Sequence, residues 1–280
     1  MCDFCIKHGD GKKWYLQAKN YGEDLASDLK RRKFVDHFFN DMMAPGPNDA
    51  IHSLRKLESA PAAVRRFIGG MLTRRFKRDH FGQVLPMEDV EKIFDICNGI
   101  VRTPCVCRRL TRGGDSAFCL GISINPDRLL GRGIVSEDFW TGPHSAGLER
   151  LTKDDALSLL RGFEGKGLCH SVWAFVIPFI GGICNCDRMD CLAMLYTFRG
   201  DTKMMFRGEY VARIDPDLCQ GCRACIRNCQ FTAISYSGAA EKCEIDQQAC
   251  WGCGVCRAAC QRNAINLLER ASVPSVARLW

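Results

Sequence analysis

Apolar residues recur at intervals near 3.6 through most of the first hundred positions, which is the period of an amphipathic helix. Proline and glycine interrupt this pattern at 45–47 and again just after Asn98, where helices are expected to end. The pattern predicts four helices, over residues 23–43, 48–59, 61–75 and 87–97. We therefore expect the first 99 residues to be mostly helical.

After Gly99 the pattern changes, because short apolar segments replace the long helical repeat. Residues 100–108 are expected to be extended, and 209–214 to form a strand. Between them, Thr152 and Asp155 have the spacing of a helix N-cap. This part of the chain therefore combines short strands with at least one further helix.

The cysteines are more informative than the overall composition. The chain has 19 Cys among 280 residues. Near the end of the chain the spacing C-x2-C-x2-C-x3-C occurs twice, and an Ala-Ile pair follows each copy. The eight residues are Cys219, Cys222, Cys225, Cys229, Cys250, Cys253, Cys256 and Cys260.

This spacing is the ligand run of a [4Fe–4S] cluster, in which the fourth Cys of each run ligates the cluster of the other run. Three Cys at intervals of three lie on one tight loop, so their sulfurs can converge on three iron atoms. Zinc is disfavoured, because a zinc site would not need the third Cys of each run. A disulfide framework is also disfavoured, because it would need an oxidising compartment and the chain shows no signal peptide. We expect one cluster on Cys219, Cys222, Cys225 and Cys260, and a second on Cys250, Cys253, Cys256 and Cys229.

Residues 215–268 resemble a bacterial two-cluster ferredoxin. Gly221 and Gly252 stand between the first two ligands of each run, where the backbone must pass close to the inorganic core. Gln230 and Gln261 stand where that ligand run usually has proline. The resemblance implies a ferredoxin-like fold and electron transfer for this part of the chain.

A second group of cysteines lies in the middle of the chain. Two C-x-C pairs are each followed by a further Cys, and residues i and i+2 of an extended segment face the same way. Each pair can therefore direct two sulfurs at one point, and the neighbouring Arg108 can donate hydrogen bonds to sulfur. We expect a third [4Fe–4S] cluster with ligands drawn from Cys105, Cys107, Cys184, Cys186 and Cys191. The alternatives are a zinc site and a set of small buried side chains.

The middle region also resembles iron–sulfur proteins of anaerobes that carry a C-terminal two-cluster ferredoxin domain. The resemblance covers residues 100–270 and implies electron transfer within a larger redox complex. The matching segments are Pro104-Cys105-Val106-Cys107-Arg108, Cys119, Gly167-Leu168-Cys169-His170 and Ile183-Cys184-Asn185-Cys186.

Other candidate ligands are less regularly spaced. Cys2, Cys5 and His8 could complete a metal site at the N-terminus, or they could be inert residues of a frayed end. We interpret His170 as a packed core histidine. The three remaining thiols are interpreted as buried and without a role in metal binding, and they are Cys97, Cys169 and Cys243.

Together these patterns predict an α+β protein. It has a mainly helical N-terminal half, a small mixed cysteine-rich middle region and a C-terminal ferredoxin-like two-cluster domain. The expected boundaries are 1–99, 100–208, 209–270 and a tail at 271–280.

The formal net charge of +7 does not indicate a nucleic-acid partner. Each [4Fe–4S] cluster with four thiolates carries about −2, so three clusters reduce the charge to about +1. The basic runs at 30–33 and 74–78 are solvated helix faces or a docking surface for an acidic redox partner. The longest apolar run, 172–180, is far short of the about 20 residues that a membrane span requires. We therefore expect a cytoplasmic protein without a membrane span.

These observations favour an electron-transfer subunit that passes single electrons between a donor and an oxidoreductase partner. No dinucleotide, phosphate-loop or flavin motif is visible, and no catalytic residue is predicted. The first alternative is a catalytic subunit that uses the middle cysteines as an active centre. The second alternative is a redox-sensing regulator that binds nucleic acid through its basic helices.

Overall fold

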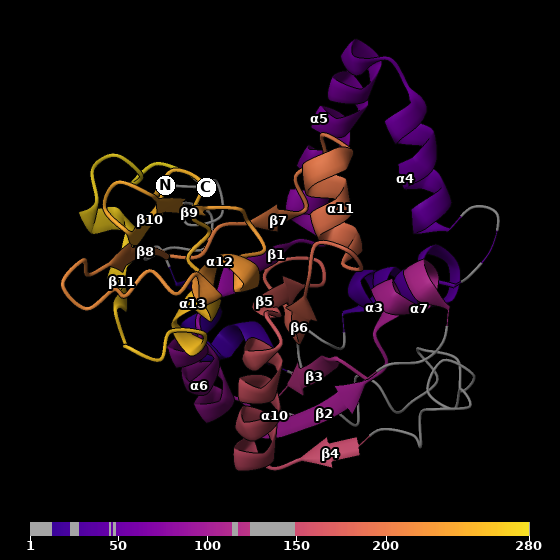
Figure 1. Cartoon of the computed structure of the whole chain (residues 1–280). Helices are drawn as coiled ribbons and strands as arrows, with labels where there is room; N and C mark the ends of the chain where they lie inside the picture. The colour runs from indigo at the N-terminus through magenta and orange to yellow at the C-terminus, as the bar shows by residue number, and fades with distance from the viewer. Residues whose placement is uncertain are drawn as a thin grey trace.

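The computed structural model describes residues 13–22, 28–44, 46, 49–113, 117–123 and 149–279. Cys2, Cys5 and His8 lie outside the described residues, so metal binding by this group stays a prediction. The described residues combine helices and sheets, as the predicted α+β class requires (Figure 1).

The helices of the first half follow the apolar pattern closely. Helices α4 and α6 lie within two residues of their predicted limits, and the helix after Pro61 is longer than predicted. The described part of the first helix begins at Leu29 and ends in a π-helical turn, η3. The bounds are α3 (Leu29–His37), η3 (Phe38–Met42), α4 (Ala50–Ser59), α5 (Ala62–Asp79) and α6 (Met87–Ile96). Two short 3-10 turns precede them, η1 (Trp14–Leu16) and η2 (Ala18–Tyr21).

A seven-stranded sheet forms the centre of the molecule, and it is larger than the small mixed region predicted. The strand order is β4-β2-β3-β6-β5-β1-β7, and only the β1–β7 pair is parallel. Strand β1 comes from the region predicted to be mostly helical. Its four residues lie between α5 and α6, and four residues are too few to reveal a period of two. The strands are β1 (Gly82–Leu85), β2 (Gly99–Thr103), β3 (Cys119–Ser123), β4 (Glu149–Leu151), β5 (Cys169–Ala174), β6 (Ile180–Cys186) and β7 (Met205–Phe206).

The extended conformation predicted for 100–108 is wrong for its second half. The strand ends at Thr103, and helix α7 (Val106–Arg112) begins directly after Cys105. The helix is short and lacks a long apolar repeat, so its sequence gives no periodic signal. Two further helices belong to this part of the chain, α10 (Lys153–Gly165) and α11 (Leu192–Arg199). The N-cap predicted at Thr152 is confirmed, because its side chain accepts a hydrogen bond of 3.1 Å from the Asp155 backbone.

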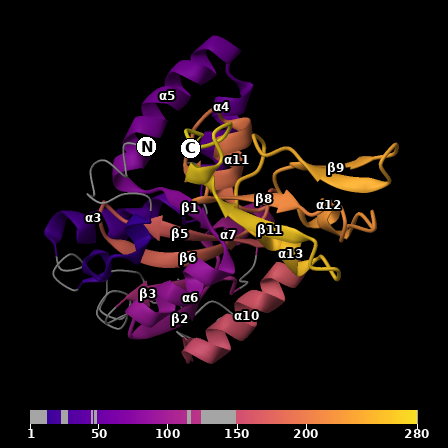
Figure 2. The same ribbon diagram turned by 90° about the vertical axis from the view of Figure 1, so that its left-hand side faces the viewer.

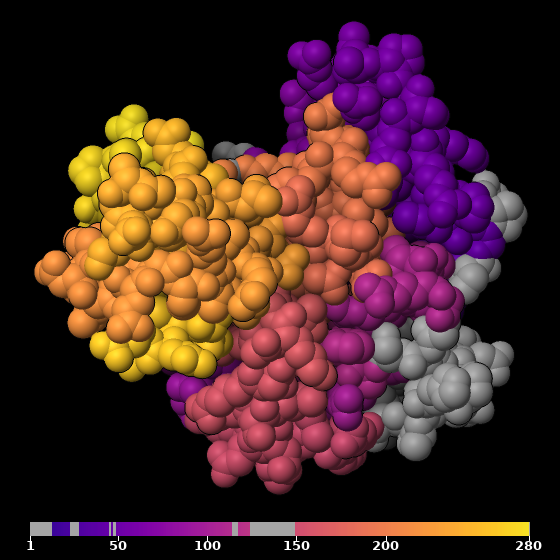
Figure 3. Space-filling model, in the orientation of Figure 1, coloured from indigo at the N-terminus to yellow at the C-terminus, as the bar shows by residue number. Residues whose placement is uncertain are grey.

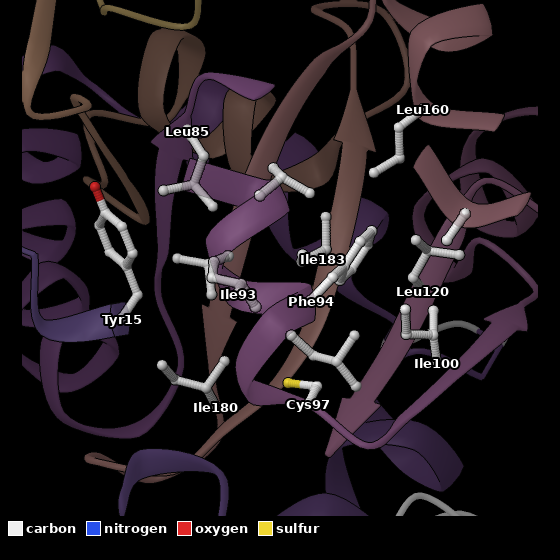
Figure 4. Packing of buried hydrophobic residues seen from close by; sticks show 14 of the residues in the cluster. Tyr15, Leu85, Ile93, Phe94, Cys97, Ile100, Leu120, Leu160, Ile180 and Ile183 are labelled. Carbon is white, nitrogen blue, oxygen red and sulfur yellow. The ribbon is translucent and has the colours of Figure 1, made fainter. Parts of the chain in front are cut away.

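One face of the sheet packs against α6 and α10. Figure 4 shows this cluster, in which Ile93 and Phe94 of α6 meet Leu120 and Ile183 of neighbouring strands. Fully burying a side chain of this size stabilises the fold by about 1.5–3 kcal/mol. This face is therefore an ordinary apolar core.

The opposite face of the sheet carries the cysteines of the middle region. Alternate residues of β5 point to opposite faces, so Val172 joins the α6–α10 core while Cys169 and Trp173 join a second core. The second core contains α11, α4 and η3, and it also includes Trp251 from the C-terminal module.

The C-terminal module consists of two similar halves. Strand β8 (Tyr210–Ile214) pairs with β11 (Ile265–Glu269), and β9 (Ile234–Ser237) pairs with β10 (Lys242–Ile245), both antiparallel. Short helices α12 (Ala224–Asn228) and α13 (Val255–Ala258) complete the halves, and a 3-10 turn, η4 (Arg270–Ser272), follows. Figure 2 shows β9 and β11 on the side of the molecule away from α3, and Figure 3 shows the module as a lobe against the preceding residues.

Gln230, which stands where the ligand run usually has proline, joins the module to the middle region. Its side-chain amide donates a hydrogen bond of 2.7 Å to the Gly167 carbonyl and accepts one of 3.1 Å from the Arg188 backbone. Nearby, the Phe231 and Trp251 rings stack with centroids 4.8 Å apart. Gln261, at the equivalent position of the second run, is exposed. Of the two glutamines, therefore, Gln230 has a clear structural role at this junction.

No helix in the described part of the chain is long and apolar enough to cross a membrane.

We predict that Gln230→Ala will loosen the junction. The substitution removes two hydrogen bonds, each worth about 1 kcal/mol, and leaves the Arg188 N–H without its acceptor. Hydrogen–deuterium exchange should show faster exchange at the Arg188 amide, with Gln261→Ala as the matched control. Equal protection in the two variants would contradict this role for Gln230.

Candidate metal centres

Two neighbouring strands of the large sheet, β3 and β6, bring cysteines to one face. Cys184 and Cys186 occupy alternate positions of β6, so the expectation that this C-x-C pair faces one way is confirmed. In the neighbouring strand, Leu120 pairs with Ile183, and this register brings Cys119 beside Cys184. Both C-x-C sulfurs of β6 and the Cys119 sulfur thus point away from the α6–α10 core.

The first C-x-C pair reaches the same place by a different route. Cys105 is the extended N-cap residue of α7, and Cys107 lies in the first turn of that helix. Cys191 is likewise the N-cap residue of α11. Helix N-termini therefore hold three of the six thiols of this site, Cys105, Cys107 and Cys191.

The six thiols form a closed ring. Each interacts through its side chain with two others, in the order Cys105, Cys107, Cys191, Cys186, Cys184, Cys119 and back to Cys105. The sequence analysis named five of these as ligand candidates. Cys119 was not among them, although it follows the first C-x-C pair and belongs to the segments that resemble iron–sulfur proteins of anaerobes.

Two members of this six-thiol ring, at opposite positions, have lowered pKa values, whereas the pKa values of the other four thiols are raised. Hydrogen bonds with the Cys107 and Cys119 thiols, together with the Arg108 guanidinium, hold the pKa of Cys105 well below its usual value. Hydrogen bonds with the Cys184 and Cys191 thiols lower the pKa of Cys186. The thiolate is the form of Cys that binds metal.

Arg108 and Arg112 connect helix α7 to the loop before α11. Arg108 Nη1 lies 3.6 Å from the Cys105 sulfur, and its Nη2 donates to Asp187 at 2.5 Å. Arg112 Nε donates to Asp190 at 2.7 Å. These bonds join α7 to the loop before α11 and fix the relative positions of Cys105, Cys107 and Cys191.

The arrangement of the ring thiols differs from that of a single-ion site. Within the described ranges, no three His, Cys, Asp or Glu side chains form a group that could hold one metal ion. The ring contacts run pairwise around a perimeter, whereas zinc needs ligands that converge on one point. The described cysteines of the C-terminal module form no group that could hold one metal ion either, so both a cluster and a zinc ion at the ring stay predictions.

The C-terminal module contains two small cavities of about 20 Å³ each. The structure thus brings together the two predicted sets of four Cys, one in each cavity. The first is lined by Cys219, Cys222, Cys225 and Cys260, and the second by Cys229, Cys250, Cys253 and Cys256.

Backbone features of the module fit a cluster. Gly221 and Gly252 have positive φ angles of 65° and 74°, and a Cβ there would lie 2.2 and 2.1 Å from a carbonyl oxygen. Backbone N–H groups of Ala212, Ala233 and Ala264 point at Cys sulfurs at 3.3–3.4 Å. Such N–H donors stabilise the negative charge of cluster-bound sulfur.

Two of the three thiols interpreted as having no metal role lie beside the candidate centres. Cys243 lines the first small cavity and interacts with Cys219 and Cys225. Cys169 is completely buried on β5, within electrostatic range of both Cys253 and Cys191. A sequence cannot show this proximity, because it arises only when the module packs on the sheet.

Cys97 and His170 are buried as predicted. Cys97 packs in the α6–α10 core, where burial raises its pKa to about 12. His170 is completely buried, its Nδ1 lies 2.6 Å from the Asn185 side-chain oxygen, and burial lowers its pKa to about 4. All seventeen cysteines in the described ranges are free thiols, so the disulfide alternative is wrong for them.

The first cysteine run of the C-terminal module matches a known protein family. Residues 212–235 match the 4Fe-4S binding domain family, Fer4, and this segment contains the first C-x2-C-x2-C-x3-C run. No curated protein matches the chain. The match supports an iron–sulfur protein with a general electron-transfer role and at least one [4Fe–4S] cluster.

Proposed function

We propose that this protein is an electron-transfer subunit that relays single electrons through three [4Fe–4S] clusters. Two would be held by the C-terminal module, with the ligand sets that line its two cavities, and the third by the six-thiol ring. When bound, the clusters supply one-electron chemistry, while the chain supplies ligands, shielding and docking. The proposed partners are redox proteins, in a larger oxidoreductase complex of an anaerobe's cytoplasm.

The observation that carries this proposal is the position of Cys169. This buried thiol lies within electrostatic range of Cys191 in the ring and of Cys253 in the second cavity. Cys169, Cys191 and Cys253 also belong to one apolar core. The space between the ring and the module is therefore filled by packed side chains of one core, and this favours electron transfer between the two sites.

The route can continue through the module to its surface. Cys256 of the second set interacts electrostatically with Cys225 of the first set. Cys222 of the first set is exposed, as is the nearby Leu218. A partner docking at this end would reach the first set directly, with the ring at the inner end of the route.

A second candidate function is a catalytic subunit that uses the ring as its active centre. The observation that favours it is a large cavity that the ring thiols line. The two functions are compatible if electrons that pass through the module are used at the ring.

We predict about twelve iron per chain, four for each cluster. The double variant Cys184→Ser/Cys186→Ser should lose about four of them, because it removes two neighbouring ring ligands. Iron and acid-labile sulfide assays on anaerobically purified protein measure this, and EPR should retain the signals of the module. Cys97→Ser is the control and should keep the full iron content. Unchanged iron in the double variant would rule out a cluster at the ring.

We predict that Cys169→Ser will keep all of the iron but raise the reduction potentials of the ring cluster and the second module cluster. A hydroxyl is a stronger hydrogen-bond donor than a thiol, and donors near cluster sulfur favour the reduced state. EPR-monitored redox titration measures these potentials, with Cys97→Ser as the matched buried-thiol control. Loss of about four iron would instead identify Cys169 as a ligand, and unchanged potentials would contradict its place on the route.

A further inference from the structure

A cavity of about 720 Å³ lies on the cysteine-bearing side of the sheet. Residues of α3, η3, α4 and α5 line it on one side, and strands β3, β5 and β6 on the other. Figure 1 shows α4, α5 and α11 standing together beside this part of the sheet. All six ring thiols line the cavity, so any molecule within it would lie close to them.

The cavity is much larger than a cluster needs. Each cavity of the C-terminal module is lined by four cluster-type cysteines and measures about 20 Å³. The cavity at the ring is more than thirty times larger than either, so a cluster at the ring would leave most of it free. Its volume lies within the range of about 300–1,000 Å³ that is typical of small-molecule sites.

The walls are mainly aromatic and apolar. They include Phe34, Phe38, Leu72, Trp173, Phe175 and Met204. Charged side chains also line the cavity, and most of them are paired within the protein. Arg75 pairs with Asp79 at 3.6 Å, Asp41 with His37 at 2.7 Å and Arg108 with Asp187 at 2.5 Å, and Lys56 belongs to the lining as well. Walls of this kind favour a neutral ligand, because a charged ligand would lose its hydration and meet charges that are mostly paired within the protein already.

His80 supplies one polar group among these walls. Its Nδ1 lies 2.8 Å from the Ala174 carbonyl oxygen, which can only accept, so Nδ1 carries the proton and Nε2 is left as an acceptor. The rings of Phe38, Phe175 and Trp173 surround the imidazole, with centroids 4.3, 4.7 and 4.8 Å from it. His80 therefore offers one hydrogen-bond acceptor within an aromatic wall.

We propose that this cavity binds a neutral aromatic small molecule with one hydrogen-bond donor, held between His80 and the six-thiol ring. Binding of a small molecule beside the ring would be a property additional to electron transfer. The binding depends on the walls and His80 and does not require a cluster. A low iron content would therefore overturn the three-cluster relay but not ligand binding in the cavity. A failure to bind the ligand would likewise leave the relay unaffected.

Equilibrium dialysis of the full-length protein with 2-naphthol tests the proposal. We expect saturable binding of one 2-naphthol per chain. 2-Methoxynaphthalene, which lacks the donor, should bind about tenfold more weakly because it cannot use His80. Non-saturable binding, or equal affinity for the two probes, would overturn the proposal.

Three variants locate the binding. Leu72→Trp fills the cavity and should weaken 2-naphthol binding at least about tenfold, while His80→Phe should remove only the preference for 2-naphthol over 2-methoxynaphthalene. Phe67→Ala is the matched control, because Phe67 lies on the outer face of α5 with 71% of its surface exposed. An equal loss of binding in Phe67→Ala and Leu72→Trp would assign the probe to the exposed surface and overturn the proposal. Circular dichroism checks that each variant is folded.

Discussion

The antiparallel register between β5 and β6 is the constraint on which the cysteine-bearing side of the molecule depends. Cys169 pairs with Cys186 and Ser171 with Cys184, and all four side chains lie on the face opposite the α6–α10 core. A slip of one residue in β6 would turn both of its cysteines into the apolar core. The alternate residues Val172 and Ile183 are completely buried in that core, so the slip would also bury polar groups and expose apolar ones. Ordinary hydrophobic packing on one face thus fixes the positions of the thiols on the other.

The six-thiol ring also requires elements that lie far apart in the chain to meet at this face of the sheet. Two ion pairs hold α7 against the loop before α11, because Arg108 contacts Asp187 and Arg112 contacts Asp190. The Arg108–Asp187 pair is largely buried, and such pairs gain little net stability because both groups lose hydration. Their clearest effect is positional, because they hold the start of α7 against the loop that leads to Cys191.

The junction between the sheet and the C-terminal module links the two sets of cysteines. Gln230 bonds to both Gly167 and Arg188, and the stacked rings of Phe231 and Trp251 close the apolar contact beside it. Within the module, the completely buried Arg270 guanidinium donates to the carbonyls of Tyr210 and Cys250, and so holds the two halves of the module together. A proline at position 230 would lack the side-chain amide, so the departure from the usual ligand run has a structural consequence. The module is therefore packed against the rest of the chain through specific bonds.

The sequence alone determined features that depend on local spacing. Helical periodicity predicted α4 and α6 within two residues, because an amphipathic helix must repeat its apolar positions every 3.6 residues. The repeated cysteine spacing predicted which thiols would share each small cavity, because a tight loop fixes three of the four sulfurs. Tertiary structure decided everything that depends on pairing between distant segments. It placed Cys119 beside Cys184, Cys169 between two cysteine sets, and His80 beside a cavity. These contacts arise from strand register and from packing on one face of a sheet, and neither leaves a periodic signal in the residues that make them.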